Sequence, residues 1–223
     1  MHVSKQILSF LKNLDFEIKL PDEVEVMNPF KDRGTYSICR KFYNKYYNDN
    51  HSRHLILGIN PGRFGGGITG IPFTDPLRLV SVCRIENAFQ KKQELSSVFI
   101  YEMIDAFGGP ENFYSKFYIS SISPLGFTKN NKNLNYYDDR NLELSLREFI
   151  IKNIDIQLTF GILRDVAFCL GEGKNFTYLS RLNDEMKFFE RVVPLPHPRF
   201  IMQYKLKKKH EYIDRYLREL TMN

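Results

Sequence analysis

The chain has 223 residues, of which 43% are hydrophobic and 26% are charged, values ordinary for a globular protein that argue against disorder. We expect a single domain over residues 1–223, because a chain of this length buries most of its unfolded surface in one core. The net charge of +6 and the pI near 9.1 favour a polyanionic partner. A basic soluble protein without such a partner has the same charge balance.

Three cysteines lie far apart, at Cys39, Cys83 and Cys169. Their odd number and wide spacing fit a reducing compartment and argue against a disulfide framework or a zinc knuckle. They are too few for a four-cysteine iron–sulfur cluster, so we expect no metal or cofactor. No apolar run is long enough to span a membrane or to act as a secretory signal. We therefore expect a cytoplasmic monomer without a membrane partner.

Helical patterns and short apolar runs alternate along the chain. In chain order we expect helices at Val3–Leu14 and Tyr36–Asn48, a strand at His54–Ile59, helices at Leu77–Lys91 and Ser96–Phe107, a strand at Phe117–Ser123, a helix at Asp139–Asn153, a strand at Ile156–Gly161, a helix at Ile162–Leu170, a strand at Arg191–Leu195 and a helix at Gln203–Leu220. Such alternation predicts a parallel sheet covered by helices on both faces. The polar connection from Pro124 to Asp138 is expected to lack regular structure, and connections of that length are more often functional than idle.

The first expected strand runs into a segment rich in glycine and proline. Its sequence is Gly58-Ile59-Asn60-Pro61-Gly62-Arg63-Phe64-Gly65, continuing to Thr69-Gly70-Ile71-Pro72-Phe73. Loops at this edge of an α/β sheet bind ligands, and glycines let the backbone approach a ligand closely. The Asn60 amide can donate and accept hydrogen bonds, and Phe73 offers a flat apolar face. This combination predicts a site for a planar, polar ligand such as a nucleobase.

The segment resembles the first motif of the uracil-DNA glycosylase superfamily, in the branch of the single-strand-selective monofunctional uracil glycosylases. That branch reads Gly-x-Asn-Pro-Gly-x-Phe-Gly, then Thr-Gly-x-Pro-Phe, and the chain keeps this spacing. The resemblance implies an α/β fold, a three-layer α/β/α sandwich with a short four-stranded parallel sheet. It also implies a DNA glycosylase that flips a damaged base out of the stack and initiates base excision repair. Phe73 would stack on the base, and we expect Ile59 and Gly62 to contact it as well.

A second motif, Pro194-Leu195-Pro196-His197-Pro198-Arg199, follows the last expected strand. Prolines on both sides restrict the direction of the His197 imidazole. An isolated loop histidine often satisfies only local hydrogen bonds, but the resembling family pairs such a histidine with the Asn-Pro-Gly loop across the base. Its segment reads His-Pro-Ser-Pro-Arg, and this chain lacks the intervening Ser-Pro. We therefore expect His197 to keep the family role while the shape of the DNA-inserting loop differs.

Hydrolysis of an N-glycosidic bond places negative charge on the departing base and positive charge on the sugar. We expect His197 to donate a hydrogen bond to a carbonyl oxygen of the base, as an oxyanion hole does. Asn60 would hold the attacking water, because an amide cannot serve as a general base near neutral pH. The expected mechanism thus relies on stabilising the leaving group. No well-placed catalytic lysine is evident, which predicts a monofunctional enzyme.

The end of the second strand, Ser120-Ser121-Ile122-Ser123-Pro124-Leu125, departs from the family. The resembling branch reads the base with an asparagine at the position of Ser121. A hydroxyl cannot make the two-point contact of an amide, so we expect a site looser than strict uracil specificity that admits hypoxanthine or xanthine. Asparagines in the following connection could supply the missing contacts: Asn130, Asn131, Asn133 and Asn135.

Basic and apolar residues interleave after His197: Arg199, Phe200, Met202, Tyr204, Lys205, Lys207, Lys208 and Lys209. Such a segment suits phosphate contacts and a wedge that fills the gap left by a flipped base, although a solvated start to a terminal helix has the same composition. We expect Arg63, Arg199, Phe200 and Lys205 to contact DNA, with Arg199 or Phe200 inserted.

Two other functions fit the same residues. A catalytically silent damage sensor would bind uracil-containing or abasic DNA without releasing a base. A hydrolase or transferase of free nucleosides or nucleotides would act on small molecules and depend little on the basic segment.

Overall fold

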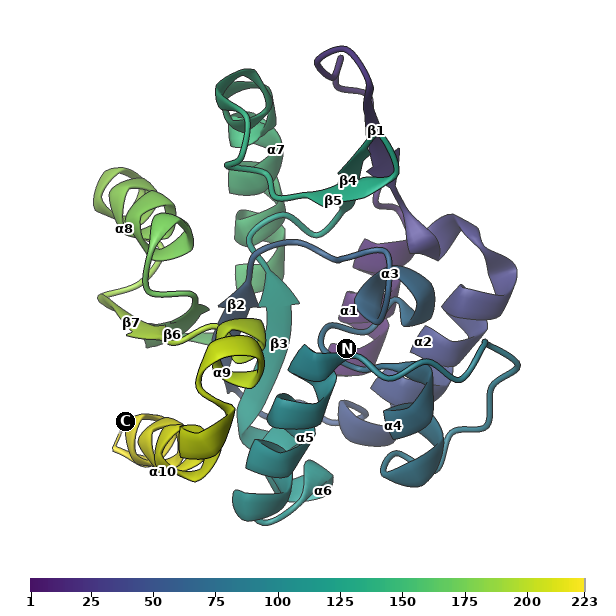
Figure 1. Ribbon diagram of the computed structural model, residues 1–223, viewed down its shortest axis with the longest axis vertical. Coiled ribbons are helices and arrows are strands. Elements are labelled where there is room, and N and C mark those ends of the chain that lie inside the picture. The colour runs from purple at the N-terminus through teal and green to yellow at the C-terminus, as the bar shows by residue number, and fades with distance from the viewer. Residues whose placement is uncertain (223) are drawn as a thin grey trace.

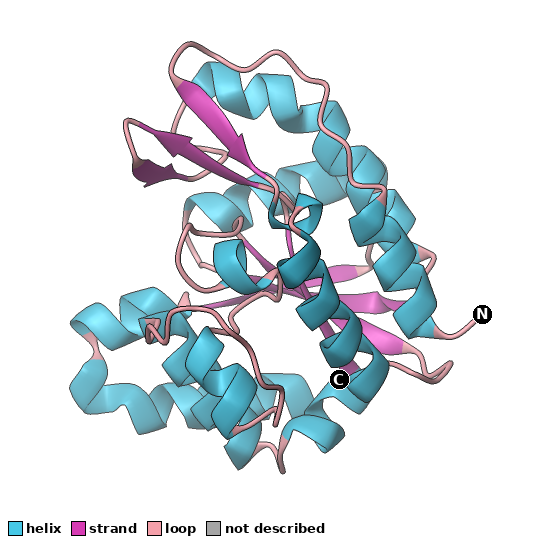
Figure 2. Cartoon of the chain, turned by 90° about the vertical axis from the view of Figure 1, so that its right-hand side faces the viewer, coloured by secondary structure: helices cyan, strands magenta, loops and turns pink. Residues whose placement is uncertain are grey.

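A computed structural model describes residues 1–222 of the chain. Four strands form a central sheet in the order β3-β2-β6-β7, and all three pairings are parallel. Figure 2 shows helices on both sides of this sheet. The expected three-layer α/β/α sandwich with a four-stranded parallel sheet is confirmed. The strands are β2 (Arg53–Gly58), β3 (Phe117–Ser121), β6 (Ile162–Leu170) and β7 (Arg191–Leu195).

Helices surround the sheet (Figure 1): α1 packs against α2, α5 packs against both α9 and α10, and α7 and α8 pack against β6. The helix bounds are α1 (Val3–Lys12), α2 (Arg33–Tyr46), α3 (Gly66–Thr69), α4 (Pro76–Ser81), α5 (Leu95–Ala106), α6 (Pro110–Lys116), α7 (Arg140–Leu158), α8 (Lys174–Met186), α9 (Pro198–Tyr204) and α10 (Lys209–Thr221). Two short 3₁₀ helices, η1 (Pro29–Lys31) and η2 (Leu206–Lys208), lie in the connections between them.

Strand β2 is held at its start by a buried arginine. The Arg53 side chain is fully buried and donates to both carboxylate oxygens of Asp49, at 2.9 and 2.8 Å, and to the carbonyl oxygen of Tyr114 at 2.7 Å. Its guanidinium also lies 4.8 Å from the centre of the Tyr47 ring. A buried charge needs such complete pairing. This anchoring fixes where β2 begins, and therefore where its carboxyl end delivers the residues that follow.

A second sheet lies at the other end of β2. Strands β1 (Val24–Met27), β4 (Gly126–Lys129) and β5 (Lys132–Leu134) pair antiparallel in the order β1-β4-β5. The expectation of an unstructured connection from Pro124 to Asp138 was therefore wrong. Asn130 and Asn131 have φ of 50° and 57° and form the turn of a hairpin, a conformation that asparagine tolerates. The hairpin is stabilised by pairing with β1, which is distant in the sequence and which local sequence did not indicate.

Two neighbouring assignments were interchanged. The segment Ile156–Gly161, expected as a strand, contains the last turn of α7, and the segment Ile162–Leu170, expected as a helix, is β6. Ile150, Ile154 and Leu158 recur at four-residue spacing and continue one face of α7 through the apolar run. Strand β6 is buried from Val166 onward because it lies between β2 and β7. An uninterrupted buried run does not distinguish a strand from a helix by periodicity.

The expected helix at Leu77–Lys91 was too long. Helix α4 ends at Ser81, and Arg84 then takes a φ of 55°, which a continuing helix does not allow. The residues from Ile85 to Glu94 form a connection to α5, and the site described below depends on the end of that connection.

Candidate active site

A cavity of about 520 Å³ opens at the carboxyl edge of the central sheet. Its walls come from the loop after β2, the end of β3, the residues after β5, the start of α5 and the segment from β7 into α9. Eight of the residues expected from sequence line it: Ile59, Asn60, Gly62, Phe73, Ser121, His197, Arg199 and Phe200. The two others, Arg63 and Lys205, are exposed and lie outside the lining. A larger hollow of about 810 Å³ between α1 and α7 contains none of these ten residues.

The Asn60 amide joins the loop after β2 to the end of the hairpin. Its Oδ1 accepts a hydrogen bond from the Tyr136 N–H at 3.1 Å, and its Nδ2 donates to the Leu134 carbonyl oxygen at 3.2 Å. These partners fix which side of the amide carries the oxygen, because one is a donor and the other an acceptor. An oxygen accepts two hydrogen bonds, so one lone pair of Oδ1 remains for a ligand or a water molecule.

The segment that Asn60 contacts is anchored on its other side. The Tyr136 ring is fully buried, and its hydroxyl donates to Asn175 Oδ1 at 2.9 Å. Asn175 in turn donates through Nδ2 to the carbonyl oxygen of Leu170, the last residue of β6, at 3.0 Å. A chain of hydrogen bonds therefore connects Asn60 to the end of β6. This arrangement holds the cavity wall in place.

His197 is the N-cap of α9, and its Nδ1 accepts a hydrogen bond from the backbone N–H of Arg199 at 3.1 Å. Because Nδ1 accepts, the proton of the neutral ring belongs on Nε2. Burial, and then the positive charge of Arg199, lowers the pKa of His197 to about 4. The imidazole is therefore neutral at neutral pH and offers an Nε2–H donor within the cavity.

Phe73 and His197 face each other across part of the cavity. Their ring centroids are 6.0 Å apart and their planes are inclined by 54°. Phe73 has a φ of 52°, an uncommon conformation for an aromatic residue. Its ring lies against the last residue of β2, because a Cβ on Gly58 would come within 2.9 Å of Phe73 Cε2. Glycine at this strand end therefore makes room for the ring that we expect to stack on a base.

Ser121 ends β3 and is paired with Gly58 in the sheet register, so the expected base reader does lie beside Phe73 and the Asn60 loop. Of the asparagines that could assist it, Asn133 and Asn135 line the cavity, whereas Asn130 and Asn131 form the hairpin turn. Asn133 Oδ1 accepts the Arg63 N–H at 3.0 Å and thereby holds the loop after β2 to the hairpin.

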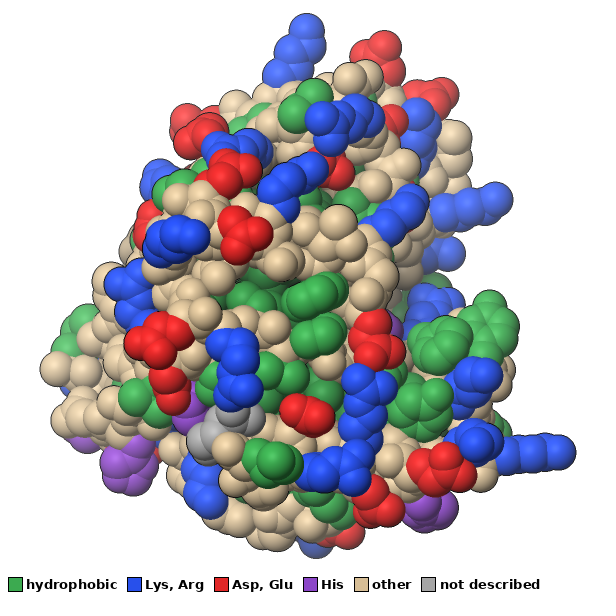
Figure 3. All heavy atoms as spheres, turned by 90° about the vertical axis from the view of Figure 1, so that its left-hand side faces the viewer, with side chains coloured by type: hydrophobic (Ala, Val, Ile, Leu, Met, Phe, Trp, Pro, Cys, Tyr) green, Lys and Arg blue, Asp and Glu red, His purple; other side chains and the backbone are tan. Residues whose placement is uncertain are grey.

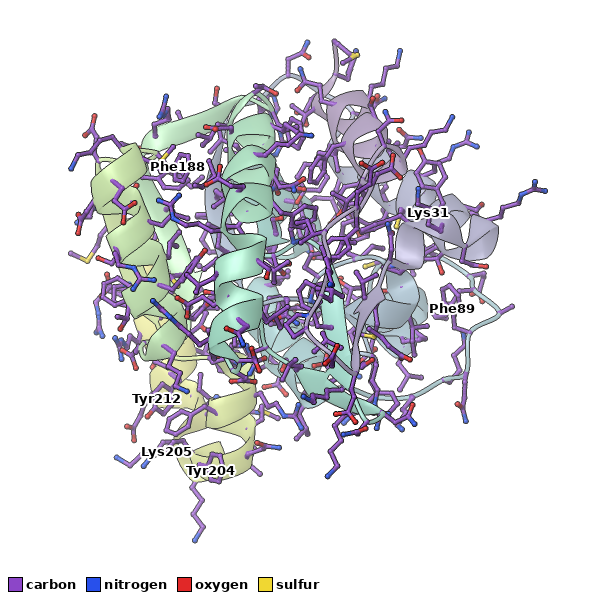
Figure 4. The ribbon with its side chains drawn as sticks, turned by 90° about the horizontal axis from the view of Figure 1, so that it is seen from above. Lys31, Phe89, Phe188, Tyr204, Lys205 and Tyr212 are labelled. Carbon is purple, nitrogen blue, oxygen red and sulfur yellow. The ribbon has the colours of Figure 1, made fainter. Side chains whose placement is uncertain are left out.

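Basic and aromatic side chains gather at the rim. Phe64 is 41% exposed, with Lys92 Nζ 3.8 Å and the Arg63 guanidinium 5.0 Å from its ring centre. On α9, the exposed rings of Phe200 and Tyr204 lie 5.7 Å apart. Figure 3 shows apolar side chains beside lysine and arginine side chains at one edge of the molecule. Figure 4 shows Tyr204 and Lys205, which lie at the junction of α9 and η2, at the edge of the molecule and away from the body of the protein.

Sequence reasoning missed the wall supplied by the end of the α4–α5 connection and the first residues of α5: Lys92, Gln93, Glu94, Leu95 and Ser96. Glu94 carries the only carboxyl group among the described residues that line the cavity. No local motif marks this segment, most of which falls in the short connection left between the expected helices at Leu77–Lys91 and Ser96–Phe107. The only sequence signal was a polar stretch, Gln90 to Glu94, directly before an apolar helix.

The structure also bears on metal ions and membranes. Residues 1–222 contain no group of three or more histidine, cysteine or acidic side chains arranged to hold a metal ion. Over the same residues, no helix has both the length and the apolar character that a membrane crossing requires.

Comparison with known proteins identifies the family. The model of the family described as "Uracil DNA glycosylase superfamily" matches residues 44–221. The crystal structure of wild-type Pedobacter heparinus SMUG2 is similar with 53% sequence identity and a TM-score of 0.97, and the match covers 100% of this chain and 98% of that chain. A search of curated proteins found no match. The motif residues, the fold and the family model agree, and the chain belongs to the uracil DNA glycosylase superfamily.

Proposed function

We propose that the chain is a monofunctional DNA glycosylase that hydrolyses the N-glycosidic bond of uracil or another deaminated base in DNA and so initiates base excision repair. One observation carries the proposal: Asn60 and Phe73 of the motif segment after β2, Ser121 at the end of β3 and His197 after β7 line a single cavity. A planar face, an amide, a hydroxyl and an imidazole donor around one cavity are what a flipped base requires.

His197 is the group that stabilises the departing base. A neutral imidazole with its proton on Nε2 can donate a hydrogen bond to a carbonyl oxygen as negative charge develops there. The proton need not be transferred to the base. Removal of one such donor typically costs on the order of 10²–10³ in rate. Protonation of His197 would end the hydrogen bond from the Arg199 N–H to Nδ1, because imidazolium has no acceptor. Excision should therefore be lost at acidic pH, as the pH approaches the lowered pKa of about 4.

Asn60 positions the attacking water and does not deprotonate it. Its Nδ2 donates to the carbonyl oxygens of Leu134 and Pro61 and its Oδ1 accepts from Tyr136, and the remaining lone pair of Oδ1 can orient a water molecule toward the sugar. The same bonds hold the segment that carries Asn133 and Asn135 at the cavity, where these side chains would be available to a base.

Ser121 broadens the range of bases that the site accepts. A single hydroxyl holds a base less selectively than an amide, so uracil, hypoxanthine and xanthine are proposed substrates. Asn133 has its Oδ1 committed to the Arg63 N–H, which leaves its Nδ2 and the side chain of Asn135 as the asparagine groups free to complete base recognition.

DNA would lie across the rim formed by Arg63, Lys92 and α9, where cationic side chains accompany exposed aromatic rings. We propose Arg199 or Phe200 as the inserted side chain, because both line the cavity and are exposed. We further propose a cytoplasmic monomer, which light scattering of the purified protein and fractionation of cells would test.

The test is base release from synthetic DNA. Single- and double-stranded oligonucleotides carrying uracil, hypoxanthine or xanthine are incubated with the protein and treated with alkali, which cleaves at abasic sites. Strand cleavage is expected with uracil and with at least one deaminated purine. Binding without cleavage would support a silent damage sensor, and activity only on free nucleosides would support a small-molecule hydrolase. Cleavage of uracil DNA alone would contradict the proposed breadth.

A further inference from the structure

The motif loop supplies an amide where an anionic group would help the reaction most. The sugar gains positive charge as the glycosidic bond breaks, and Asn60 carries no charge to stabilise it. Glu94 is the only described carboxyl group that lines the cavity. The protein is basic, and Glu94 lies beside the surface expected to bind phosphates. A carboxylate there weakens DNA binding, so its presence calls for a role in the reaction.

The backbone around Glu94 is held firmly. Glu94 is the N-cap residue of α5, and its N–H donates to Asp75 Oδ2 at 2.9 Å. Asp75 is fully buried and also caps α4 by accepting the Arg78 N–H at 2.8 Å. One buried carboxylate therefore fixes both the start of α4 and the position of Glu94.

The Glu94 side chain reaches the motif loop. A Cβ on Gly65 would lie 2.5 Å from Glu94 Oε2, so the carboxyl group contacts the loop five residues after Asn60. Gly65 has a φ of +70°, which glycine adopts without strain. Any other residue here would both strain the backbone and displace the carboxyl group. The glycine thus permits the carboxyl to lie in the cavity wall beside the loop.

We propose that Glu94 is a catalytic carboxylate of this glycosylase, which stabilises the positive charge on the deoxyribose and accepts a proton from the attacking water. The inference rests on the proposed function. The C1′–N bond breaks with its electron pair leaving on the base, whose carbonyl oxygen accepts the His197 hydrogen bond. The water oxygen then bonds to C1′, and the proton that it loses passes to the Glu94 carboxylate and on to solvent. The departed base anion takes a proton from solvent, so the sum is hydrolysis.

The charges around Glu94 suit this role. Burial has the largest effect on the pKa of Glu94 and raises it. A hydrogen bond from Ser96 lowers the pKa, the negative charge of Asp75 raises it and the positive charge of Arg199 lowers it. The resulting pKa is about 7. The other charged or titratable groups of the cavity include Lys92 and His197, which is neutral near pH 7. Since the folded pKa lies near neutrality, Glu94 is mainly neutral at pH 5.5 and mainly ionised at pH 8.5. A general base is most effective with a pKa near the working pH.

The first test is a pH profile of single-turnover uracil release by wild type and Glu94→Gln. Glu86→Gln is the matched control, because Glu86 is an exposed acid in the same connection that does not line the cavity. Wild type and the control should speed up as the pH rises through about 7. Glu94→Gln should be slower by roughly 10²-fold at pH 8.5, should approach wild type at pH 5.5 and should show no rise between them. A wild-type rate and profile in Glu94→Gln would overturn the proposal.

A second test does not need base release. DNA containing a cationic pyrrolidine in place of one sugar mimics the charge that develops on deoxyribose, and a neutral tetrahydrofuran site has a similar shape. At pH 8.5 the wild type should bind the cationic site roughly tenfold more tightly than the neutral one, and Glu94→Gln should lose that preference. Equal preference in both proteins would reject the role of Glu94. If wild type shows the preference but releases no base, the proposed function fails while the assignment of an anionic group at this position stands.

Discussion

Asn60→Asp is the most informative change at the site, because it exchanges one NH₂ group for oxygen while keeping the shape of the side chain. The Asn60 Oδ1 bond to the Tyr136 N–H can persist in the variant. The other oxygen would face the Leu134 carbonyl oxygen, to which Nδ2 donates at 3.2 Å in wild type. The loss of that hydrogen bond and the presence of two facing acceptors should lower the free energy of unfolding by on the order of 2 kcal/mol at pH 8.

The destabilisation should depend on pH. A protonated aspartic acid can again donate to the Leu134 oxygen, so the folded protein raises the pKa of the new carboxyl above its unfolded value of about 4. The variant should therefore regain stability as the pH falls toward that unfolded value and lose it as the pH rises through the folded one. Asn60→Ala removes the bonds to Tyr136, Leu134 and Pro61 and should show a penalty that changes little with pH.

The assay is denaturant unfolding of wild type, Asn60→Asp and Asn60→Ala at several values from pH 4.5 to 8. The difference between each variant and wild type at the same pH removes the titration of all other groups. If Asn60→Asp matches wild type at pH 8, or follows Asn60→Ala at every pH, then the hydrogen bond to Leu134 does not determine the choice of an amide at this position.

Two further predictions concern specificity and DNA contact. Ser121→Asn should shift the ratio of excision rates toward uracil and away from hypoxanthine and xanthine, because an amide can make a two-point contact with the uracil edge. An unchanged ratio would argue that Asn133 and Asn135 read the base. Tyr204→Ala should weaken binding to single-stranded DNA by roughly tenfold, because base stacking on the exposed ring is lost. Lys205→Ala should reduce the slope of the logarithm of the binding constant against the logarithm of the salt concentration by about 1. Equal affinities and equal salt slopes in wild type and both variants would place the DNA elsewhere.

The segments that build the site were predictable because their chemistry is local. Gly58 to Gly65 indicates a tight loop after a strand, and prolines around His197 indicate a rigid one, so both were assigned to the edge of the sheet from sequence. Parallel strands deliver their carboxyl ends to the same edge, and the structure brings Asn60, Phe73, Ser121 and His197 into one cavity there.

The parts that sequence did not reveal depend on contacts between distant segments. The hairpin of β4 and β5 forms because it pairs with β1, and the direction of the Asn60 amide follows from two backbone groups more than 70 residues away. Glu94 enters the cavity through its backbone bond to Asp75 and the bare backbone of Gly65. The interchange of strand and helix around Ile162 arose because apolar side chains fill both kinds of buried element equally well.

The central claim is that a neutral His197, facing Phe73 across the cavity, stabilises the departing base. The most direct test is the single-turnover rate of uracil release at pH 7.5 by wild type, His197→Ala and His197→Asn, the last of which retains a side-chain cap for α9. Both variants should bind uracil DNA nearly as well as wild type and release the base roughly 10²–10³-fold more slowly. Release at the wild-type rate by either folded variant would contradict the claim.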